Sequence, residues 1–262
     1  MTTRLTILGS GTSHGVPMIG CPCAVCRSDD PRDRRTRPSA VFQYDGRTLL
    51  IDTSPELRLQ CLACGIERVD ALLYTHHHAD HVTGLDDVRV FNQRQRQTLA
   101  AYGSRATLDR LRKMFPYAFE ADPDYPSVIP KLDAQAIAAP FELFGRVITP
   151  VPYLHGGLEV LGYRMGDSAY CPDCNHIPDA SRPLLAGLDT LVLDAVRHTP
   201  HPTHFHLEQA IEEARRIGAR RTYFTHIAHE ISHAATQATL PAGMFLAYDG
   251  LVVEQSRQAA QE

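Results

Sequence analysis

Residues able to bind metal ions are concentrated in one short segment of the chain. Four histidines and one aspartate follow the apolar run 71–74, namely His76, His77, His78, Asp80 and His81. Zinc, manganese and iron(II) accept neutral imidazole and carboxylate ligands, and five such groups exceed what one tetrahedral ion uses. We therefore expect two ions, with His76 and His78 facing one position and Asp80 and His81 facing another on the following turn.

A solvated histidine-rich loop or an adventitious metal-binding tract is the alternative interpretation of this segment. The apolar residues before it are typical of a buried strand, which would hold the histidines in fixed places. The order His-x-His-x-Asp-His also differs from a polyhistidine tract. A specific metal centre is the better interpretation.

A second set of metal ligands lies near the start of the chain. Cys21, Cys23 and Cys26 place three thiols within six residues, which supplies three of the four ligands of a tetrahedral zinc ion. Such a knuckle fixes a loop that has little core of its own, so we expect a structural role. Three reduced, buried thiols without a metal are the alternative.

The composition suits a folded protein with one core. A chain of 262 residues, 44% of them hydrophobic, predicts one compact α/β domain. We expect the domain at residues 1–254 and a flexible tail at 255–262. The first residues lack the apolar run of a signal peptide and no window has the length of a membrane span, which favours a cytoplasmic protein.

Charge and cysteine content narrow the choice of partners. Seven cysteines in a cytoplasmic chain favour metal binding over disulfides. A net charge of −4 without basic runs argues against a nucleic-acid substrate. Neither nucleic acid nor a membrane is an expected partner, and a homodimer is compatible with the sequence.

Alternating strand and helix patterns surround the ligands. A first strand is expected at 4–8, before a glycine-rich loop in which His14 is a candidate to approach the site. Asp45-Gly46 predicts a hairpin between two β-rich runs. Thr53 or Ser54 is expected to cap a helix that ends at Gly65. The expected elements of the next segment are a strand near 98–102 and a helix over 104–115.

The segment from Pro116 to Pro152 contains seven prolines. Because proline removes a backbone donor, long regular structure is not expected there. A loop on the substrate side and a plain surface excursion are equally compatible with this composition.

Three later strands end close to histidines. An apolar run over 150–154 ends at His155, which in isolation would be read as a structural histidine. A buried strand at 191–194 leads to several histidines before a helix over 207–217, and a helix start is a natural site for anions. Those histidines are His198, His201, His204 and His206.

The last informative strand, at 222–225, delivers two histidines with different expected targets. His226 follows the strand directly and should point into the cleft. His229 lies beyond the turn, where it can reach the loop that carries the three cysteines. We therefore expect the two histidines to serve different metals.

The segment from His76 to His81 resembles the metal-binding motif of the metallo-β-lactamase superfamily of dinuclear metallohydrolases. That resemblance implies an α/β fold, a four-layer αββα sandwich with the metals at one edge between the two sheets. The Cys21 loop, the Asp52-Thr53 turn, Thr203-His204 and Thr225-His226-x-x-His229 extend the resemblance to its PhnP-like phosphodiesterase branch.

The resemblance implies a role for each ligand. His76, His78 and His155 would hold one divalent ion, manganese or zinc, and Asp80, His81 and His226 the other. Asp173 would bridge the two ions, and His204 would assist at the phosphate. A structural zinc would be held by Cys21, Cys23, Cys26 and His229. Cys171 and Cys174 flank Asp173 and depart from the family pattern, as does the crowded histidine set around His204.

The implied reaction is hydrolysis of a small, in some cases cyclic, phosphodiester by a hydroxide held between the metals. Asp80 and His204 are the catalytic candidates. One alternative is a non-hydrolytic protein that resembles the PqqB proteins of quinone-cofactor biosynthesis. Another is a protein that binds metal without turnover, and a tRNA-processing endonuclease is disfavoured by the net charge. Cys61 and Cys64, one helical turn apart, are interpreted as core thiols, with a second metal or redox site as the alternative. Zinc binding or pairing is the alternative for Cys171 and Cys174, and the sequence leaves the roles of His14, His198, His201 and His206 open.

Overall fold

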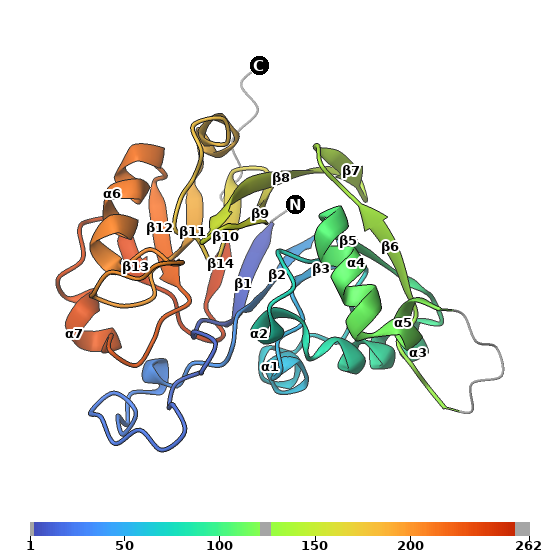
Figure 1. Ribbon diagram of the computed structural model, residues 1–262, viewed down its shortest axis with the longest axis horizontal. Helices are drawn as coiled ribbons and strands as arrows, with labels where there is room; N and C mark the ends of the chain where they lie inside the picture. Colours follow the sequence, from blue (N-terminus) through green and yellow to red (C-terminus); the bar gives the residue numbers. More distant parts are fainter. Residues whose placement is uncertain (1–2, 121–126, 255–262) are drawn as a thin grey trace.

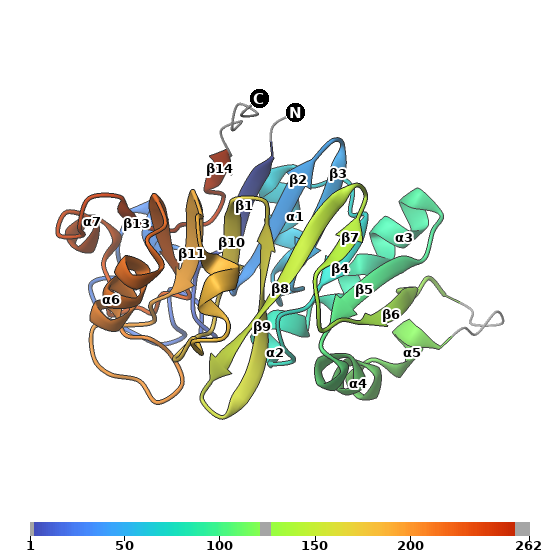
Figure 2. The ribbon, with the colours of Figure 1, turned by 90° about the horizontal axis from the view of Figure 1, so that it is seen from above.

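Two seven-stranded sheets lie face to face at the centre of the molecule, and helices cover their outer faces (Figure 1, Figure 2). The computed structural model describes residues 3–120 and 127–254. The expected tail at 255–262 lies outside the described residues. This arrangement confirms the predicted four-layer αββα sandwich.

The first sheet mixes antiparallel and parallel strands. In spatial order it contains β14 (Val252–Glu254), β1 (Arg4–Gly9), β2 (Ser39–Tyr44), β3 (Arg47–Ile51), β4 (Ala71–Leu73), β5 (Leu99–Gly103) and β6 (Leu132–Ala136). The strands from β3 to β6 run parallel to one another. The Asp45-Gly46 turn joins β2 and β3, which confirms the predicted hairpin.

The second sheet has a parallel half and an antiparallel half. In spatial order it contains β13 (Met244–Leu246), β12 (Arg221–Thr225), β11 (Thr190–Asp194), β10 (Ser168–Cys171), β9 (Leu158–Met165), β8 (Arg146–His155) and β7 (Phe141–Leu143). The strands from β10 to β13 are parallel. Their carboxyl ends therefore meet at one edge of the sheet.

Helices cover both sheets. Those on the first sheet are α1 (Leu57–Cys64), α2 (Ala79–Val82), α3 (Arg89–Gln95), α4 (Arg105–Met114) and α5 (Pro116–Phe119). Those on the second are α6 (Leu207–Ile217) and α7 (His233–Gln237). Short 3-10 turns occupy Pro31–Asp33, Leu85–Val88 and Arg182–Leu185. Within the described ranges, no helix has the length and apolar character needed to cross a membrane.

Three apolar cores hold the four layers together. The central one joins the inner faces of the two sheets, with Phe42 of β2, Tyr163 of β9 and Val192 of β11 fully buried. A second core joins the first sheet to α1–α5, and a third joins the second sheet to α6. Each sheet is thus buried on both faces, which explains why its parallel strands are continuous apolar runs.

The expectation that regular structure would be short between Pro116 and Pro152 was wrong. β8 is a ten-residue strand that contains Pro150 and Pro152. The amide of Leu154 points away from β9 and donates to His176 O at 2.9 Å. Because backbone groups alternate along a strand, the nitrogens of Pro150 and Pro152 also point away from β9. Because pairing with β7 stops at Ile148, neither proline removes a ladder hydrogen bond.

Helix α1 begins later than predicted. Its first residue is Leu57, and its N-cap residue is Glu56, which makes no side-chain capping bond. The hydroxyls expected to cap it have other partners, since Thr53 bonds Val82 O and Ser54 donates to Gln60 Oε1 at 2.8 Å. The predicted end is confirmed, because Gly65 adopts the left-handed conformation that closes the last turn.

Candidate metal centres

The predicted ligands lie at strand ends of both sheets, where the backbone turns sharply. Asp173 and His226 have φ angles of 50° and 60°, and Asp52, at the end of β3, has a φ of 60°. The left-handed region is uncommon for residues other than glycine, and such strain clusters at functional sites. After these turns, Asp173 and His226 join the candidate metal cluster and Asp52 contacts His81.

Four predicted ligands form a first group, His76, His78, His155 and Asp173, whose ligand atoms lie within 4.8 Å of one another. Asp173 Oδ2 lies 3.8 Å from His76 Nε2 and 4.0 Å from His155 Nε2. The rings of His78 and His155 are 4.9 Å apart between centroids. His78 is exposed, so this group opens to solvent.

A second group combines Asp80, His81, Asp173 and His226. His81 Nε2 lies 3.1 Å from Asp173 Oδ1 and 3.6 Å from Asp80 Oδ2. His226 Nε2 lies 3.3 Å from Asp173 Oδ2 and 3.5 Å from Asp80 Oδ2. Asp173 belongs to both groups, as the bridging position requires.

Fixed acceptors orient the ligand histidines. His81 Nδ1 lies 2.7 Å from Asp52 Oδ2, and Asp52 also accepts from the amide and hydroxyl of Thr75. Because the Thr75 hydroxyl donates to Asp52, it accepts from His76 Nδ1 at 3.0 Å. His155 Nδ1 donates to Thr203 O at 2.7 Å. In each ring Nδ1 is engaged, so Nε2 is the nitrogen that faces the cluster and could bind a metal ion.

The buried polar atoms of the cluster fit bound metal ions. His76 Nε2, His81 Nε2, His226 Nε2 and Asp173 Oδ1 are buried and have no well-aligned hydrogen-bond partner among the described residues. An unsatisfied buried polar group costs about 1–3 kcal/mol. Four such atoms converging from several elements are the donor set that divalent ions use, so the residues fit the implied group.

The electrostatics of the cluster depend on its buried carboxylates. Burial lowers the pKa of His76 well below its usual value. Burial also acts to lower the pKa of His81, but Asp173, Asp80 and Asp52 raise it well above the usual value. Burial would raise the pKa of Asp173, yet His226 and His81 hold it well below its usual range. The ligand carboxylate is therefore ionised at neutral pH.

His204 lies beside both groups without belonging to either. Its ring stacks on His226 with centroids 4.6 Å apart and tilts against His155 at 4.4 Å. His204 Nδ1 lies 2.7 Å from Asp194 Oδ2, at the end of β11. Burial opposes the charged ring, but Asp194 raises the pKa of His204 to about 9. Asp194 therefore favours the protonated form of this ring, which lies next to the candidate metal positions.

The crowded histidine set does not gather as one group. His201 lies 4.9 Å from His204 between ring centroids, and its Nδ1 accepts from the Thr203 amide at 3.3 Å. His206 is the N-cap residue of α6, with its Nδ1 2.7 Å from Gln209 Oε1. His198 is exposed on the loop.

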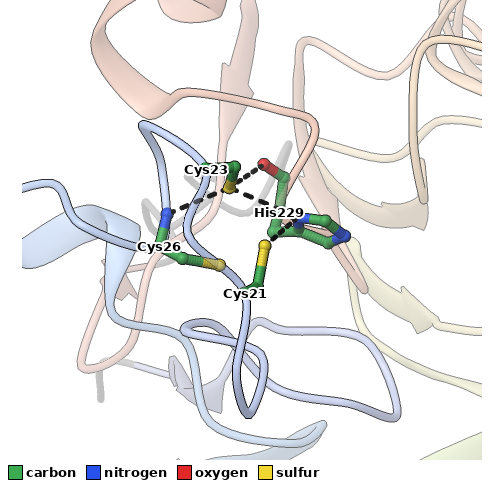
Figure 3. Close-up of side chains that lie close together, drawn as sticks. All are labelled: Cys21, Cys23, Cys26 and His229. Atoms are coloured by element: carbon green, nitrogen blue, oxygen red, sulfur yellow. Dashed lines mark hydrogen bonds between the residues drawn. The ribbon is translucent and has the colours of Figure 1, made fainter.

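The cysteine loop forms a separate cluster with His229 (Figure 3). Cys21 Sγ and Cys23 Sγ each lie 3.4 Å from His229 Nδ1, and the ligand atoms of Cys26 and the other three are within 4.8 Å of one another. The Cys26 amide, followed by His229, lowers the pKa of Cys23 to about 6. A thiolate with a convergent imidazole suits zinc.

A buried arginine ties this loop to the segment that carries His229. Arg35 is 1% exposed and forms an ion pair with Asp33 Oδ1 at 2.8 Å. Its guanidinium also donates to the carbonyl oxygens of Ala228, at 3.2 Å, and Ile231, at 2.9 Å. His226 and His229 thus lie on one segment but face different clusters, and only His226 is near Asp80.

The remaining cysteines lie in apolar cores. Cys171 and Cys174 are fully buried between the second sheet and α6, where burial raises the pKa of both thiols. Cys61 of α1 is buried in the core between this helix and the first sheet, and Cys64 is partly buried against the same core. All seven cysteines are free thiols, and within the described chain these core thiols join no group with metal-ligand spacing.

Sequence reasoning missed the residues that hold the ligands in place. Asp52 orients His81, Asp194 orients His204, and the Thr203 carbonyl orients His155. Both aspartates directly end apolar strands that run parallel to a ligand-bearing strand. An acidic residue at the end of such a strand was the sequence signal for the two aspartates. The Thr203 carbonyl belongs to the backbone, so the sequence contains no signal for its role.

Comparison with known proteins identifies relatives of this arrangement. Residues 47–227 match the beta-lactamase superfamily domain. An octanoyltransferase of Porphyromonas gingivalis is 38% identical over 95% of this chain, which spans about half (51%) of that protein. Coenzyme PQQ synthesis protein B of Methylobacterium radiotolerans is 29% identical over 73% of this chain and 72% of its own length.

Solved structures extend the comparison. The crystal structure of a new diphosphatase from the PhnP family has a TM-score of 0.91 and 47% identity, covering 97% of this chain and 98% of that one. Zinc-bound PqqB from Methylobacterium extorquens has a TM-score of 0.77 at 23% identity, over 95% and 99% of the two chains, and shows the shared fold. The chain belongs to the beta-lactamase superfamily and is similar to the PhnP family within it.

Proposed function

We propose that this protein is a dinuclear metal-dependent phosphodiesterase that acts on small phosphodiesters, cyclic ones included. The observation that carries the proposal is that Asp173 is shared by two ligand groups, with the ring of His204, paired with Asp194, beside them. The similarity to a PhnP-family diphosphatase supports phosphoryl chemistry. The substrate is a small molecule rather than nucleic acid.

His76, His78 and His155 would hold one ion, Asp80, His81 and His226 the other, and Asp173 both. Bound divalent ions, manganese or zinc, would supply a water nucleophile at neutral pH and neutralise the phosphoryl oxygens. Asp52 and Thr203 keep His81 and His155 oriented for this task.

His204 is the proton donor in this proposal. Its Nδ1–H is held by Asp194, so its Nε2–H is the group left to give a proton to the leaving alkoxide or to hydrogen-bond the phosphoryl group. Asp194 stabilises the imidazolium form before the reaction. Asp80 would contribute by binding the second ion together with His226 and His81, which lie beside it.

The Cys21, Cys23, Cys26 and His229 cluster would hold one structural zinc ion. Four protein ligands close the coordination shell, which leaves no position for a substrate. We place the protein in the cytoplasm, where such thiols stay reduced.

The PqqB relative keeps a second function open, that of a cofactor-biosynthesis protein or metal binder without hydrolysis. A phosphodiester panel with manganese, zinc and nickel tests the choice, using bis(p-nitrophenyl) phosphate and five-membered cyclic phosphates. Metal uptake with turnover supports the phosphodiesterase. Metal uptake without turnover of any diester would favour the alternative. The acyl transfer named for the Porphyromonas relative is not proposed, because this chain spans only half of that protein.

A further inference from the structure

A cavity of about 530 Å³ begins at Asp80 and extends towards the cysteine loop. The wall contributed by the N-terminal part of the chain includes Ser13, His14, Met18, Ile19 and Arg37. This volume is in the range of small-molecule sites. The cavity is thus lined on one side by Asp80, a proposed metal ligand. On another side it is lined by a loop that has no role in the proposed reaction.

The cavity has an apolar wall and a polar end. Met18 and Ile19 form part of the apolar wall, and Ile19 is 98% exposed, the most exposed large apolar side chain among the described residues. Arg37 and His14 supply polar groups. A ligand with a ring and several oxygen acceptors would match both parts.

Arg37 is held in place before any ligand arrives. Its Nη2 forms an ion pair with Glu56 Oε1 at 2.7 Å, and its backbone amide donates to Glu56 Oε2 at 3.2 Å. A guanidinium has five N–H donors, and among the described residues only Nη2 of this side chain has an acceptor. The other donors remain available to a neutral, oxygen-bearing ligand group.

The cysteine cluster fixes the apolar wall. The Met18 amide donates to Cys26 Sγ at 3.3 Å, and the Cys21 amide donates to Met18 O at 3.0 Å. The loop with Met18 and Ile19 is therefore bonded directly to two of the proposed zinc ligands. It lies on the same side of the molecule as α2, which carries Asp80 (Figure 1).

We propose that this cavity binds the organic group that stays on phosphorus, and that the group is a ring-bearing alcohol of nucleoside size. The inference rests on the proposed phosphodiesterase function. His204, the proposed proton donor to the leaving group, does not line the cavity. We therefore assign the cavity to the other substituent on phosphorus, the one that is not released. The cysteine loop then sets substrate choice as well as local stability.

The test compares two diesters that release the same p-nitrophenolate but retain different groups, thymidine 5′-p-nitrophenyl phosphate and methyl p-nitrophenyl phosphate. Wild-type protein, loaded with manganese, should show a lower KM for the thymidine ester. In Ile19→Ser the ratio of the two KM values should shift by about tenfold against the thymidine ester, with kcat for that ester within twofold. Val147→Ser, an exposed valine of β8, is the matched control and should leave the ratio unchanged.

Binding gives a readout independent of turnover. Thymidine 5′-monophosphate should bind the metal-loaded protein more tightly than inorganic phosphate by calorimetry, and Ile19→Ser should weaken only the nucleotide. If neither ester were hydrolysed but this preference held, the proposed reaction would fail and the cavity assignment would stand. Equal KM values for both esters, with no nucleotide preference, would overturn the assignment.

Discussion

The histidine–aspartate cluster between the sheets and the cysteine cluster on the N-terminal loop are built in opposite ways. In the first, strand ends of both sheets supply the ligands, and buried acceptors such as Asp52 hold ligand rings in place. In the second, three ligands come from six consecutive residues, and Cys21 and Cys23 are partly exposed. The fold positions the first cluster, whereas the second cluster holds its own loop in shape.

Losing a ligand should therefore have different consequences in the two clusters. The largest effect is expected for Asp80→Ala or His226→Ala, which should lower diesterase turnover by about a thousandfold or more, because each removes a proposed ligand of the proposed second ion. The melting temperature should stay close to that of the wild type. Steady-state kinetics and calorimetry make the measurement.

Asp109→Ala, an exposed position on α4, is the control for these two variants. Turnover within about tenfold of wild type, roughly 1.4 kcal/mol, would mean that the second ion is dispensable. The histidine–aspartate cluster could then no longer be distinguished from the cysteine cluster by a catalytic role.

The converse result is expected for His229→Ala. Loss of the fourth zinc ligand should destabilise the protein by about 3 kcal/mol and lower its zinc content, while part of the activity survives at low temperature. Thermal unfolding and elemental analysis check this, with His198→Ala as an exposed histidine control. A stable variant that kept its tightly held zinc and lost all activity would require exchanging the roles of His226 and His229.

The types and spacing of the residues indicated most of these candidate ligands, whereas His155 and Asp173 were implied only by the family resemblance. The placement of His226 and His229 near different clusters also follows from a strand end and a turn. Asp52 could have been found from its position directly after an apolar strand, whereas the Thr203 carbonyl could not be predicted, because its role depends on how distant segments align. The late start of α1 was missed for the same reason, since Thr53 and Ser54 bond to groups that only the folded chain brings near them.

A smaller effect should come from the group that orients a ligand. Asp52→Asn keeps the shape but removes the charge that faces His81 Nδ1. We expect metal affinity to fall by about 10–100-fold, with activity recovering at high metal concentration. Titration of activity against manganese measures this. Asp45→Asn, in the β2–β3 turn, should behave as the wild type, and an unchanged metal titration of Asp52→Asn would show that the fold alone orients the ring.

The smallest effect is expected on the pH dependence of stability, through His233, which lies near the segment that supports the cysteine loop. Burial, followed by Arg32 and Arg35, lowers the pKa of His233 to about 4, whereas Asp30 and Asp33 act in the opposite direction. Its ring also meets Tyr248. The unfolded chain, with a His pKa of about 6.5, binds the proton first, so stability should fall as the pH drops from about 6.5 to 4.

His233→Gln should reduce this loss, so that its melting temperature changes by a few degrees less than that of the wild type over the same pH interval. Thermal unfolding at a series of pH values gives the comparison. Identical pH profiles for the two proteins would show that protonation of His233 does not cause the acid sensitivity.

Counting metal ions before and after mild chelation tests the contrast between the clusters most directly. The purified protein should carry about three ions per chain, because two four-ligand groups share Asp173 and a third stands apart. Chelation should remove two ions together with all diesterase activity, leave one zinc, and allow manganese to restore turnover. Loss of every ion with the fold intact and the thiols reduced, or full activity after the two ions had gone, would contradict the assignment of one site to chemistry and the other to structure.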